Sequence, residues 1–311
     1  MPRAKGRDGL SLNAVVRGVS DRLSAAGVPS PDHDAVALVA LVLGEAPVEV
    51  RTAAARGDDV PEGWDDAPLE ALVARRAARE PLQHLIGVAP FRGLEIAVGP
   101  GVFVPRPETE VVAGAAIEAA RERAASGAVE VADLCSGTGA IGLAVAHEVS
   151  EARVVLVEVD DDAVSWLRRN VEASSAAGRV EVVHADVARA LTGREGRFDV
   201  VVSNPPYVPT DGQPVEPEAA HDPVRALYGL GEDGLAVPRI VIDAAARLLK
   251  GGGILVVEHS DLQGEAMRDE LLGSGEWEDV CTGRDLAGRE RYALARRAPI
   301  VTDSACDRSG N

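Results

Sequence analysis

Hydrophobic residues near the start of the chain recur at helical spacing. One set lies three or four positions apart and predicts an amphipathic helix: Leu12, Val15, Val16, Val19 and Leu23. A second helix is expected to have Asp32 or Asp34 as its N-cap and to run through Leu43. A third is expected over about 68–79, and the Gly-, Pro- and Asp-rich stretch 45–66 is expected to be loop with a short helix. This pattern predicts a small helical domain.

The spacing of apolar residues changes between Gln83 and Val104. Short apolar runs interrupted by glycines replace the helical period, which is typical of a β-hairpin. We therefore expect a helical domain over residues 1–82, a hairpin linker over 83–105, a second domain over 106–297 and a disordered tail over 298–311.

Strands and helices alternate in the second domain. β-branched runs predict strands at 129–134, 153–158, 180–184, 198–203 and 253–258, and the first four are apolar enough to be buried on both faces. Helical patterns follow at about 139–149, 161–175, 234–249 and 263–273, and two shorter strands near 277–282 and 290–296 complete a set of seven. Such alternation predicts an α/β fold with a doubly wound, mostly parallel, Rossmann-like sheet. Ligands of these sheets bind at the carboxyl ends of the strands.

The charge of the chain excludes some functions. The 311 residues include 50 acidic and 32 basic side chains, a formal charge of −18 at pH 7. This balance repels polyanions and argues against a nucleic-acid substrate.

The longest apolar run, 35–43, is far shorter than the roughly 20 residues that span a bilayer. The first ten residues also lack the apolar core of a secretory signal, so we expect a cytoplasmic protein with no membrane partner.

The cysteines suggest neither a disulfide framework nor a metal site. Cys135, Cys281 and Cys306 are odd in number and far apart, and the histidines are scattered. Reduced thiols and no metal are therefore expected.

A glycine-rich loop follows the first predicted strand of the second domain. Asp133 lies in that strand, and Gly137, Gly139 and Gly142 form a G-x-G-x-x-G pattern before the next helix. Glycines let the chain turn sharply and let a ligand approach the backbone. Glu158 ends the second strand, where a carboxylate can accept hydrogen bonds from both hydroxyls of a ribose. The pattern predicts an adenosine-containing cofactor, with NAD and S-adenosylmethionine both open.

Three side chains around this loop refine the interpretation. Asp133 favours S-adenosylmethionine, because a carboxylate suits the ammonium and sulfonium groups of that ligand and repels a pyrophosphate. Asp186, after the third strand, could meet an adenine amine, although an ordinary helix cap is the simpler interpretation. Cys135 is interpreted as a small apolar filler rather than a reactive thiol.

The fourth strand runs into Asn204-Pro205-Pro206-Tyr207. The prolines predict a turn but do not account for the Asn and the Tyr. This motif resembles that of the S-adenosylmethionine-dependent methyltransferases that act on planar nitrogens of adenine, cytosine or glutamine. The side-chain oxygen of Asn204 and the carbonyl of Pro205 can each accept one N–H of the target and so turn its nitrogen toward the methyl group. Tyr207 can pack on the flat face of the target.

The flanking sequence makes the resemblance more specific. Several segments resemble the HemK/PrmC family: Pro81 to Gly87, Gly101 to Glu110, Asp222-Pro223, Val257-Glu258-His259 and Asp285 to Arg289. Members of this family methylate the glutamine of the Gly-Gly-Gln loop in class-1 peptide chain release factors. The resemblance covers about residues 10–297 and implies a class I methyltransferase sheet of seven strands, with a helical N-terminal domain that helps to grip the release factor.

The resemblance also implies roles for single residues. S-adenosylmethionine would be held by Asp133, Cys135, Ser136, Gly137, Thr138, Gly139, Glu158, Asp186, Val187 and Asn204. The glutamine would be bound and activated by Asn204, Pro205, Pro206 and Tyr207, with Phe103 and Arg106 near the mouth of the pocket. Glu158 replaces an aspartate common in the family, with the same charge and a longer side chain.

Three other functions stay open at this point. The first is methylation of a glutamine in a ribosomal protein. The second is methylation of adenine in a nucleic acid, which the charge of −18 and the short connection from Val208 to Arg225 argue against. The third is a binding protein without catalysis, for which a disrupted Asn204 or glycine loop would be expected; both are intact.

Overall fold

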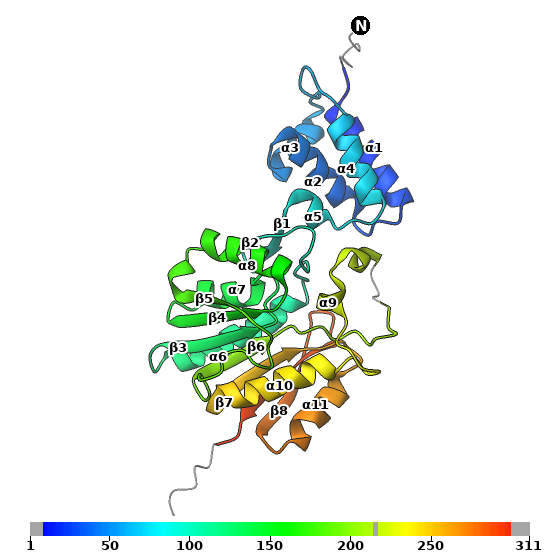
Figure 1. Ribbon diagram of the computed structural model, residues 1–311. Coiled ribbons are helices and arrows are strands. Elements are labelled where there is room, and N and C mark those ends of the chain that lie inside the picture. Colours follow the sequence, from blue (N-terminus) through cyan, green and yellow to red (C-terminus); the bar gives the residue numbers. More distant parts are fainter. Residues whose placement is uncertain (1–8, 214–216, 300–311) are drawn as a thin grey trace, which may run out of the picture. The chain divides into compact units, whose positions relative to one another are not determined.

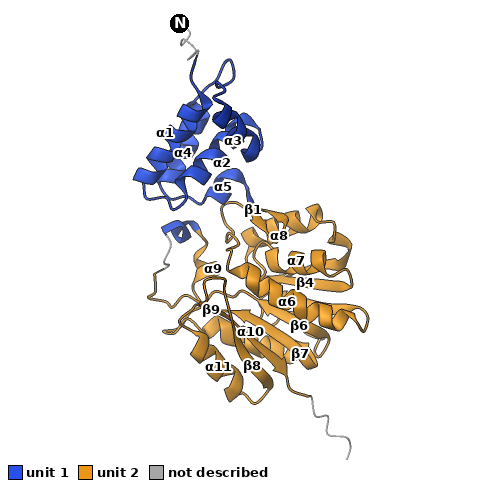
Figure 2. Ribbon diagram, turned by 180° about the vertical axis from the view of Figure 1, so that it is seen from behind, with its two compact units in different colours: residues 1–88, 215–221 blue, residues 89–214, 222–311 orange. Residues whose placement is uncertain are grey.

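The computed structural model describes residues 9–213 and 217–299. The chain divides into two compact units (Figures 1 and 2), and each is described by itself. The helical unit comprises residues 1–88 and 215–221, and the sheet unit comprises 89–214 and 222–311. The domain limits expected from the sequence stay predictions, and most of the expected disordered tail, from residue 300 on, lies outside the described residues.

The described part of the helical unit contains α1 Leu12–Ala25, α2 Pro31–Leu43, α3 Pro47–Arg56, α4 Ala67–Ala77 and α5 Leu82–Ile86. Leu23, Leu38 and Leu69 lie in the single apolar core of this unit. One local prediction is wrong: Asp32 and Asp34 are in the first turn of α2, whose N-cap is Ser30. Carboxylates in a first turn still stabilise a helix, because they face the positive end of its dipole.

A short segment from later in the chain belongs to the helical unit. Residues 217–221 form the 3-10 helix η2, Pro217–His221, whose Glu218 bonds to Arg76 and Arg79 of this unit. Arg76 is nearly buried and also bonds to Asp34 of α2. The chain therefore enters the sheet unit, returns briefly to the helical unit after residue 214, and leaves it again after residue 221.

The sheet unit opens with the expected hairpin. Strands β1 Val88–Phe91 and β2 Leu94–Ala97 form a separate two-stranded sheet, while the start of the predicted hairpin segment forms α5 instead. The main sheet has seven strands: β3 Val129–Leu134, β4 Ala152–Glu158, β5 Val180–His184, β6 Phe198–Ser203, β7 Leu249–Glu258, β8 Trp277–Arg284 and β9 Glu290–Arg297.

The strands lie in the order β5-β4-β3-β6-β7-β9-β8. Pairs from β5 to β7 are parallel, and β9 is antiparallel to both of its neighbours. Helices α6 Thr109–Ala124, α7 Ala140–Glu148 and α8 Asp161–Ala173 share one apolar cluster with the sheet, and α10 Ala236–Leu248 and α11 Gly264–Gly273 share the other. Figure 1 shows helices on both faces, so the predicted doubly wound, mostly parallel sheet is confirmed.

The prediction that the first four strands are buried on both faces is wrong for β5. This strand is the edge of the sheet, and its five residues are all partly or fully exposed, whereas β3, β4 and β6 are almost completely buried. Among the described residues, no helix is long and apolar enough to cross a membrane.

The order of the strands indicates where a ligand would bind. Successive strands β3, β4 and β5 run toward one edge, and β6 then crosses to the other side of β3. Leu134 and Ser203 are paired at the carboxyl ends of β3 and β6. Loops that leave adjacent strands in opposite directions open a crevice at this switch point. The glycine loop follows β3, and the Asn204–Tyr207 turn follows β6.

Candidate active site

The backbone of the glycine loop is left-handed at three residues, of which only Cys135 is strained by it. Cys135, Gly137 and Gly139 all have φ between 54° and 83°, in the left-handed region. The amide of Ser136 donates to the carbonyl of Val157 in β4 (2.9 Å), and its hydroxyl donates to the carbonyl of Asp133 (2.7 Å). A non-glycine residue in this region costs free energy, so the surrounding bonds hold Cys135 in place.

The glycines of the loop differ in what surrounds them. A Cβ on Gly142 would lie 2.2 Å from Leu156, and one on Gly139 would lie 2.5 Å from Leu167, so both allow α7 to pack closely. A Cβ on Gly137 would meet no atom within 4 Å. The loop is therefore packed on one side and open at Gly137, which is where a ligand can approach the backbone.

Asp133 lies beneath the loop. Its Oδ2 accepts from the amide of Gly142 in the first turn of α7 (2.9 Å), and its Oδ1 is buried without a hydrogen-bond partner among the described residues. Burial raises the pKa of this carboxyl to about 8, and the charge of Glu158 adds to the effect. Asp133 thus fixes the start of α7, and its predicted contact with the cofactor stays a prediction.

The thiol of Cys135 is not activated. Burial, assisted by the charge of Glu158, raises its pKa far above the usual range. The side chain packs against the apolar cluster shared with α10 and α11, as does Val187. The neutral thiol fits the interpretation of Cys135 as a filler.

Glu158 stands at the carboxyl end of β4. Its Oε2 accepts from the amide of Gly137 (2.8 Å), and its Oε1 accepts from the amides of Val159 (2.8 Å) and Asp160 (2.9 Å). These bonds fix the carboxylate against the open side of the glycine loop. Asp186, after β5, is exposed and accepts from the amide of Ala188 (2.9 Å). A bond of this kind, from a side chain to an amide two residues later, is what a capping residue makes.

The Asn204–Tyr207 turn is tightly packed from behind. The amide nitrogen of Gln263 donates to the carbonyl of Tyr207 (2.9 Å). A Cβ on Gly229 would lie 2.6 Å from the Pro206 carbonyl, and one on Gly234 would lie 2.3 Å from the Tyr207 carbonyl. The segment after α9 Val224–Leu227 therefore lies directly on the backbone of the turn and fixes its shape.

Side chains from three other elements meet the turn. Asn204 donates from Nδ2 to the hydroxyl of Thr109 (3.3 Å), and Tyr207 donates to Oε1 of Glu258 (3.4 Å). Burial raises the pKa of Tyr207 and the charge of Glu258 adds to it, while Arg291 and Arg106 oppose it. The phenol therefore stays protonated near neutral pH.

The predicted mouth residues lie beside this turn. The guanidinium of Arg106 stacks on the ring of Phe103, 5.0 Å from its centroid, and donates to the buried Asp222 (2.6 Å). The charge of Arg106 also acts on Tyr207. Arg106 therefore lies close enough to the turn for its charge to act on Tyr207, and the predicted place of Phe103 and Arg106 at the mouth of the pocket stays a prediction.

Sequence reasoning gave no role to Thr109, Glu258, Gln263 or Asp222. Glu258 carried a usable signal, because an acid at the carboxyl end of a buried parallel strand faces the ligand edge of the sheet. Thr109 and Gln263 carried none, because their contacts depend on how distant segments meet.

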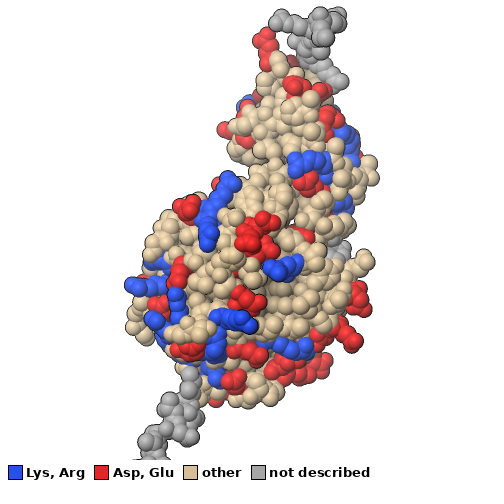
Figure 3. Space-filling model, in the orientation of Figure 1, with Lys and Arg blue, Asp and Glu red and all other residues tan. Residues whose placement is uncertain are grey.

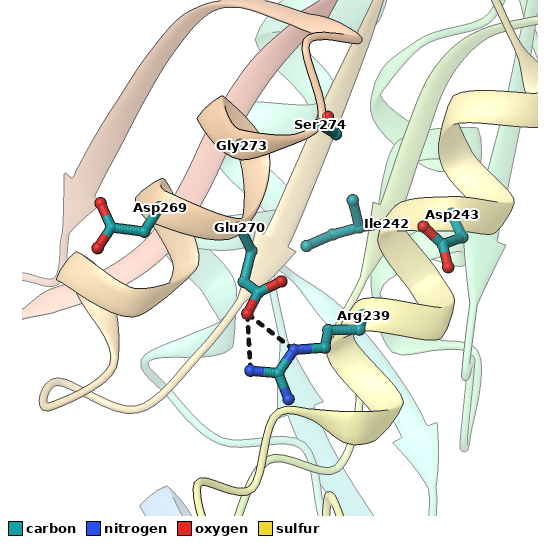
Figure 4. Close-up of a pocket in the computed structure, with 7 residues that line it drawn as sticks. All are labelled: Arg239, Ile242, Asp243, Asp269, Glu270, Gly273 and Ser274. Atoms are coloured by element: carbon teal, nitrogen blue, oxygen red, sulfur yellow. Dashed lines mark hydrogen bonds and ion pairs between the residues drawn. The ribbon is translucent and has the colours of Figure 1, made fainter.

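Two hollows in the described surface lie away from this site. The first, of about 360 Å³, lies between α10 and α11, where Figure 4 shows Arg239 and Glu270 pointing toward one another in an ion pair. The second, of about 760 Å³, lies at the amino ends of β3 to β6. Ligands of parallel sheets bind at the opposite ends. In residues 9–213 and 217–299, no group of three or more His, Cys, Asp or Glu could hold a metal.

The fold and the site together define a class I S-adenosylmethionine-dependent methyltransferase: a parallel sheet ending in the antiparallel β9, a glycine loop after β3 and an Asn-Pro-Pro-Tyr turn after β6. Comparisons with known proteins agree. A family described as the methyltransferase small domain matches residues 117–279, and the PrmC N-terminal domain matches residues 14–87.

Relatives that match over almost their whole length identify the family more closely. The release factor glutamine methyltransferase of Streptomyces coelicolor is 47% identical over 291 residues, which cover 92% of this chain and 98% of the relative. The release factor glutamine methyltransferase of Bifidobacterium longum is 38% identical over 294 residues, which cover 91% of this chain and 99% of the relative. Among solved structures, a methyltransferase from Pyrococcus furiosus is 20% identical; the match covers 67% of this chain and 90% of the other, with a TM-score of 0.47. The chain belongs to the release factor glutamine methyltransferase family, and the predicted resemblance is confirmed.

Proposed function

We propose that this protein transfers a methyl group from S-adenosylmethionine to the side-chain amide nitrogen of the glutamine in the Gly-Gly-Gln loop of class-1 release factors. The observation that carries the proposal is the Asn204–Tyr207 turn directly beside the glycine loop, at the paired ends of β6 and β3. The names of the full-length relatives support the choice of substrate.

The loop residues fit this cofactor. Gly137 is open to a ligand, Glu158 presents a carboxylate beside it, and the buried Oδ1 of Asp133, which has no hydrogen-bond partner among the described residues, can accept from a polar group of the ligand. Residues 135–139 and Glu158 would hold the cofactor, with Asp186 and Val187 beside its adenine and Asn204 at its methyl end. When bound, it supplies a methyl group on a sulfonium, which is electrophilic.

The turn supplies orientation. An amide nitrogen is a weak nucleophile, since its lone pair is delocalised into the carbonyl. The oxygen of Asn204 and the carbonyl of Pro205 would each accept one N–H of the glutamine, which favours a pyramidal nitrogen. Pro205 and Pro206 fix the backbone that presents these acceptors, and Tyr207 would pack on the amide plane. Positioning is then the main contribution to the rate.

The charge distribution is compatible with a protein substrate. Figure 3 shows acidic and basic side chains interspersed on the visible face rather than a continuous basic stripe. Binding along nucleic acid would require such a stripe.

The proposal is tested by offering labelled S-adenosylmethionine with release factor, ribosomal subunits or DNA in separate reactions. Label on the release factor is expected. Label on the ribosomal subunits alone would indicate that the substrate is a ribosomal glutamine instead, and label on DNA alone would contradict a protein substrate.

A further inference from the structure

The side chain of Asn170, in α8, bonds to the backbone of two segments that are far from each other in the chain. Its Oδ1 accepts from the amide of Ala97 (2.8 Å), and its Nδ2 donates to the carbonyls of Ala97 (3.0 Å) and Thr138 (3.0 Å). The residue is 5% exposed, so solvent does not compete for these bonds. Ala97 ends β2, and Thr138 lies in the glycine loop. One buried side chain therefore joins the end of β2 to the loop.

An amide side chain satisfies all three of these partners. The N–H of Ala97 needs an acceptor and the two carbonyls need donors, and asparagine has one oxygen and two N–H groups to match them. These partners also decide which way the amide of Asn170 points. A carboxylate of the same shape only accepts, so it would leave both carbonyls without a donor.

On the loop side, the bond helps to fix the peptide unit that follows the open Gly137. The carbonyl of Thr138 accepts from Asn170. The amide of Gly139, in the same peptide unit, donates to the carbonyl of Ser136 (2.7 Å). Because a peptide unit is planar, holding both of its polar groups fixes its orientation. Asn170 therefore helps to set the shape of the loop where a ligand can approach it.

On the other side, α8 holds the chain that follows β2. The indole Nε1 of Trp166 donates to the carbonyl of Pro100 (3.2 Å), and a Cβ on Gly99 would lie 2.5 Å from the Trp166 ring. This chain continues to Thr109, whose hydroxyl accepts from Nδ2 of Asn204. Residues 97–109, here called the acceptor segment, therefore run from α8 to the Asn204–Tyr207 turn.

We propose that Asn170 is a positioning residue that joins the glycine loop to the acceptor segment, so that S-adenosylmethionine and the glutamine are held at a fixed separation. Transfer of a methyl group requires its two reactants to be close together and aligned. Phe103 and Arg106, which are expected at the mouth of the pocket, belong to the same segment. The inference rests on the proposed function, which assigns the cofactor to the loop and the glutamine to the turn.

The first test replaces the amide with a carboxylate. Asn170→Asp keeps an acceptor for the N–H of Ala97 but leaves the carbonyls of Ala97 and Thr138 without donors. We expect the dissociation constant of S-adenosylhomocysteine, the product form of the cofactor, to rise about 10- to 100-fold in calorimetry, which corresponds to one or two unsatisfied buried groups. Asn13→Asp makes the same change at an exposed position of α1 and should leave the constant unchanged. A wild-type constant in Asn170→Asp would overturn the proposal.

A second variant separates the two sides of α8. Trp166→Phe removes the bond to Pro100 and leaves the bond from Asn170 to Thr138 in place. We expect it to raise the KM for release factor without changing the dissociation constant of S-adenosylhomocysteine, whereas Asn170→Asp should raise both. An unchanged KM in both variants would contradict the link to the acceptor segment. Equal weakening of S-adenosylhomocysteine by the two variants would mean that the packing of α8, and not the Thr138 bond, supports the loop.

The third test needs no variant and so does not depend on how the variants fold. In nitrogen-15 NMR of the wild-type protein, saturation with S-adenosylhomocysteine is expected to shift the side-chain amide signal of Asn170, because its Nδ2 donates to the loop that binds the ligand. The corresponding signal of Asn13 should not shift. An Asn170 signal that stays unchanged would overturn the proposal.

The same measurements separate this inference from the proposed function. If the Asn170 signal shifts and Asn170→Asp weakens S-adenosylhomocysteine while release factor receives no methyl group, the proposed function fails and the role of Asn170 toward the loop stands. If release factor is methylated and Asn170→Asp binds S-adenosylhomocysteine like wild type, the role of Asn170 fails and the proposed function stands.

Discussion

At the scale of single residues, two carboxyl groups beside one loop have different surroundings. Glu158 accepts from three backbone amides, whereas Asp133 accepts from one and has a buried oxygen without a partner in the described chain. Burial raises the pKa of Asp133 to about 8. A carboxyl that is mostly neutral at pH 7 resembles an amide in charge and shape.

Asp133→Asn is therefore expected to fold and to keep the bond to Gly142. Because the folded pKa lies above the unfolded value of 3.8, wild-type Asp133 stabilises the fold fully below pH 3.8 and loses that contribution as pH rises through about 8. The variant has no such loss, so its melting temperature relative to wild type should rise from pH 4 to pH 9. A constant difference across this range would show that Asp133 is ionised in the fold at neutral pH.

Asn204→Ala removes the proposed acceptor for the target nitrogen. We expect kcat to fall by about 100-fold or more, as when a preorganised hydrogen-bonding group is deleted from an active site. Affinity for S-adenosylmethionine, measured by calorimetry, should remain close to wild type. Retention of full turnover would refute the role given to Asn204.

At the scale of elements, the pattern of apolar residues predicted each strand of the main sheet to within a few residues, because β-branched runs in buried strands have no competing period. It failed only to predict the exposure of β5, since an edge strand and a central strand can have the same apolar sequence. The glycine loop and the Asn204–Tyr207 turn were found because each is contiguous. The bonds from Asn204 to Thr109 and from Tyr207 to Glu258 were not predicted, because 95 and 51 positions separate the partners in the chain and only the fold brings them together.

Gly234 tests how the segment before α10 supports the turn. Its φ is +72°, and an added Cβ would lie 2.3 Å from the Tyr207 carbonyl and 2.8 Å from the Pro209 nitrogen. Gly193 has a φ of +87° and open space around its Cβ position, so it is a matched control. Both Ala variants should lose about 1 kcal/mol for the left-handed conformation. Only Gly234→Ala should also lose most methyl transfer, and equal activities would show that the turn is not fixed from this side.

At the scale of the whole molecule, the return of residues 217–221 to the helical unit depends on a buried charge network. Burial raises the pKa of Glu218, but hydrogen bonds from Arg79 and Arg76 outweigh it and lower the pKa to about 2. Removing one member of a buried network leaves the other charges without full compensation. The sequence alone did not predict this anchor, because its members come from α2, α4 and η2 and from the loop after α4.

Glu218→Gln is expected to lower the free energy of unfolding by about 3 kcal/mol at pH 7. Glu70→Gln, which breaks the exposed pair with Arg22 in the same unit, should cost less than about 1 kcal/mol. Because the folded pKa of Glu218 is below the unfolded value of 4.5, its contribution is present above pH 4.5 and is lost as pH falls toward 2. Denaturant unfolding at several pH values should show the gap to wild type closing over this range, and a constant gap would contradict the network.

The identity of the methylated atom separates the proposed reaction from its alternatives. Release factor incubated with the enzyme and S-adenosylmethionine should be digested and sequenced by tandem mass spectrometry. We expect a single added methyl group on the side-chain amide of the Gly-Gly-Gln glutamine, and none when that glutamine is replaced. A methyl group on any other residue, or an unmodified release factor beside methylated DNA or ribosomal protein, would contradict it.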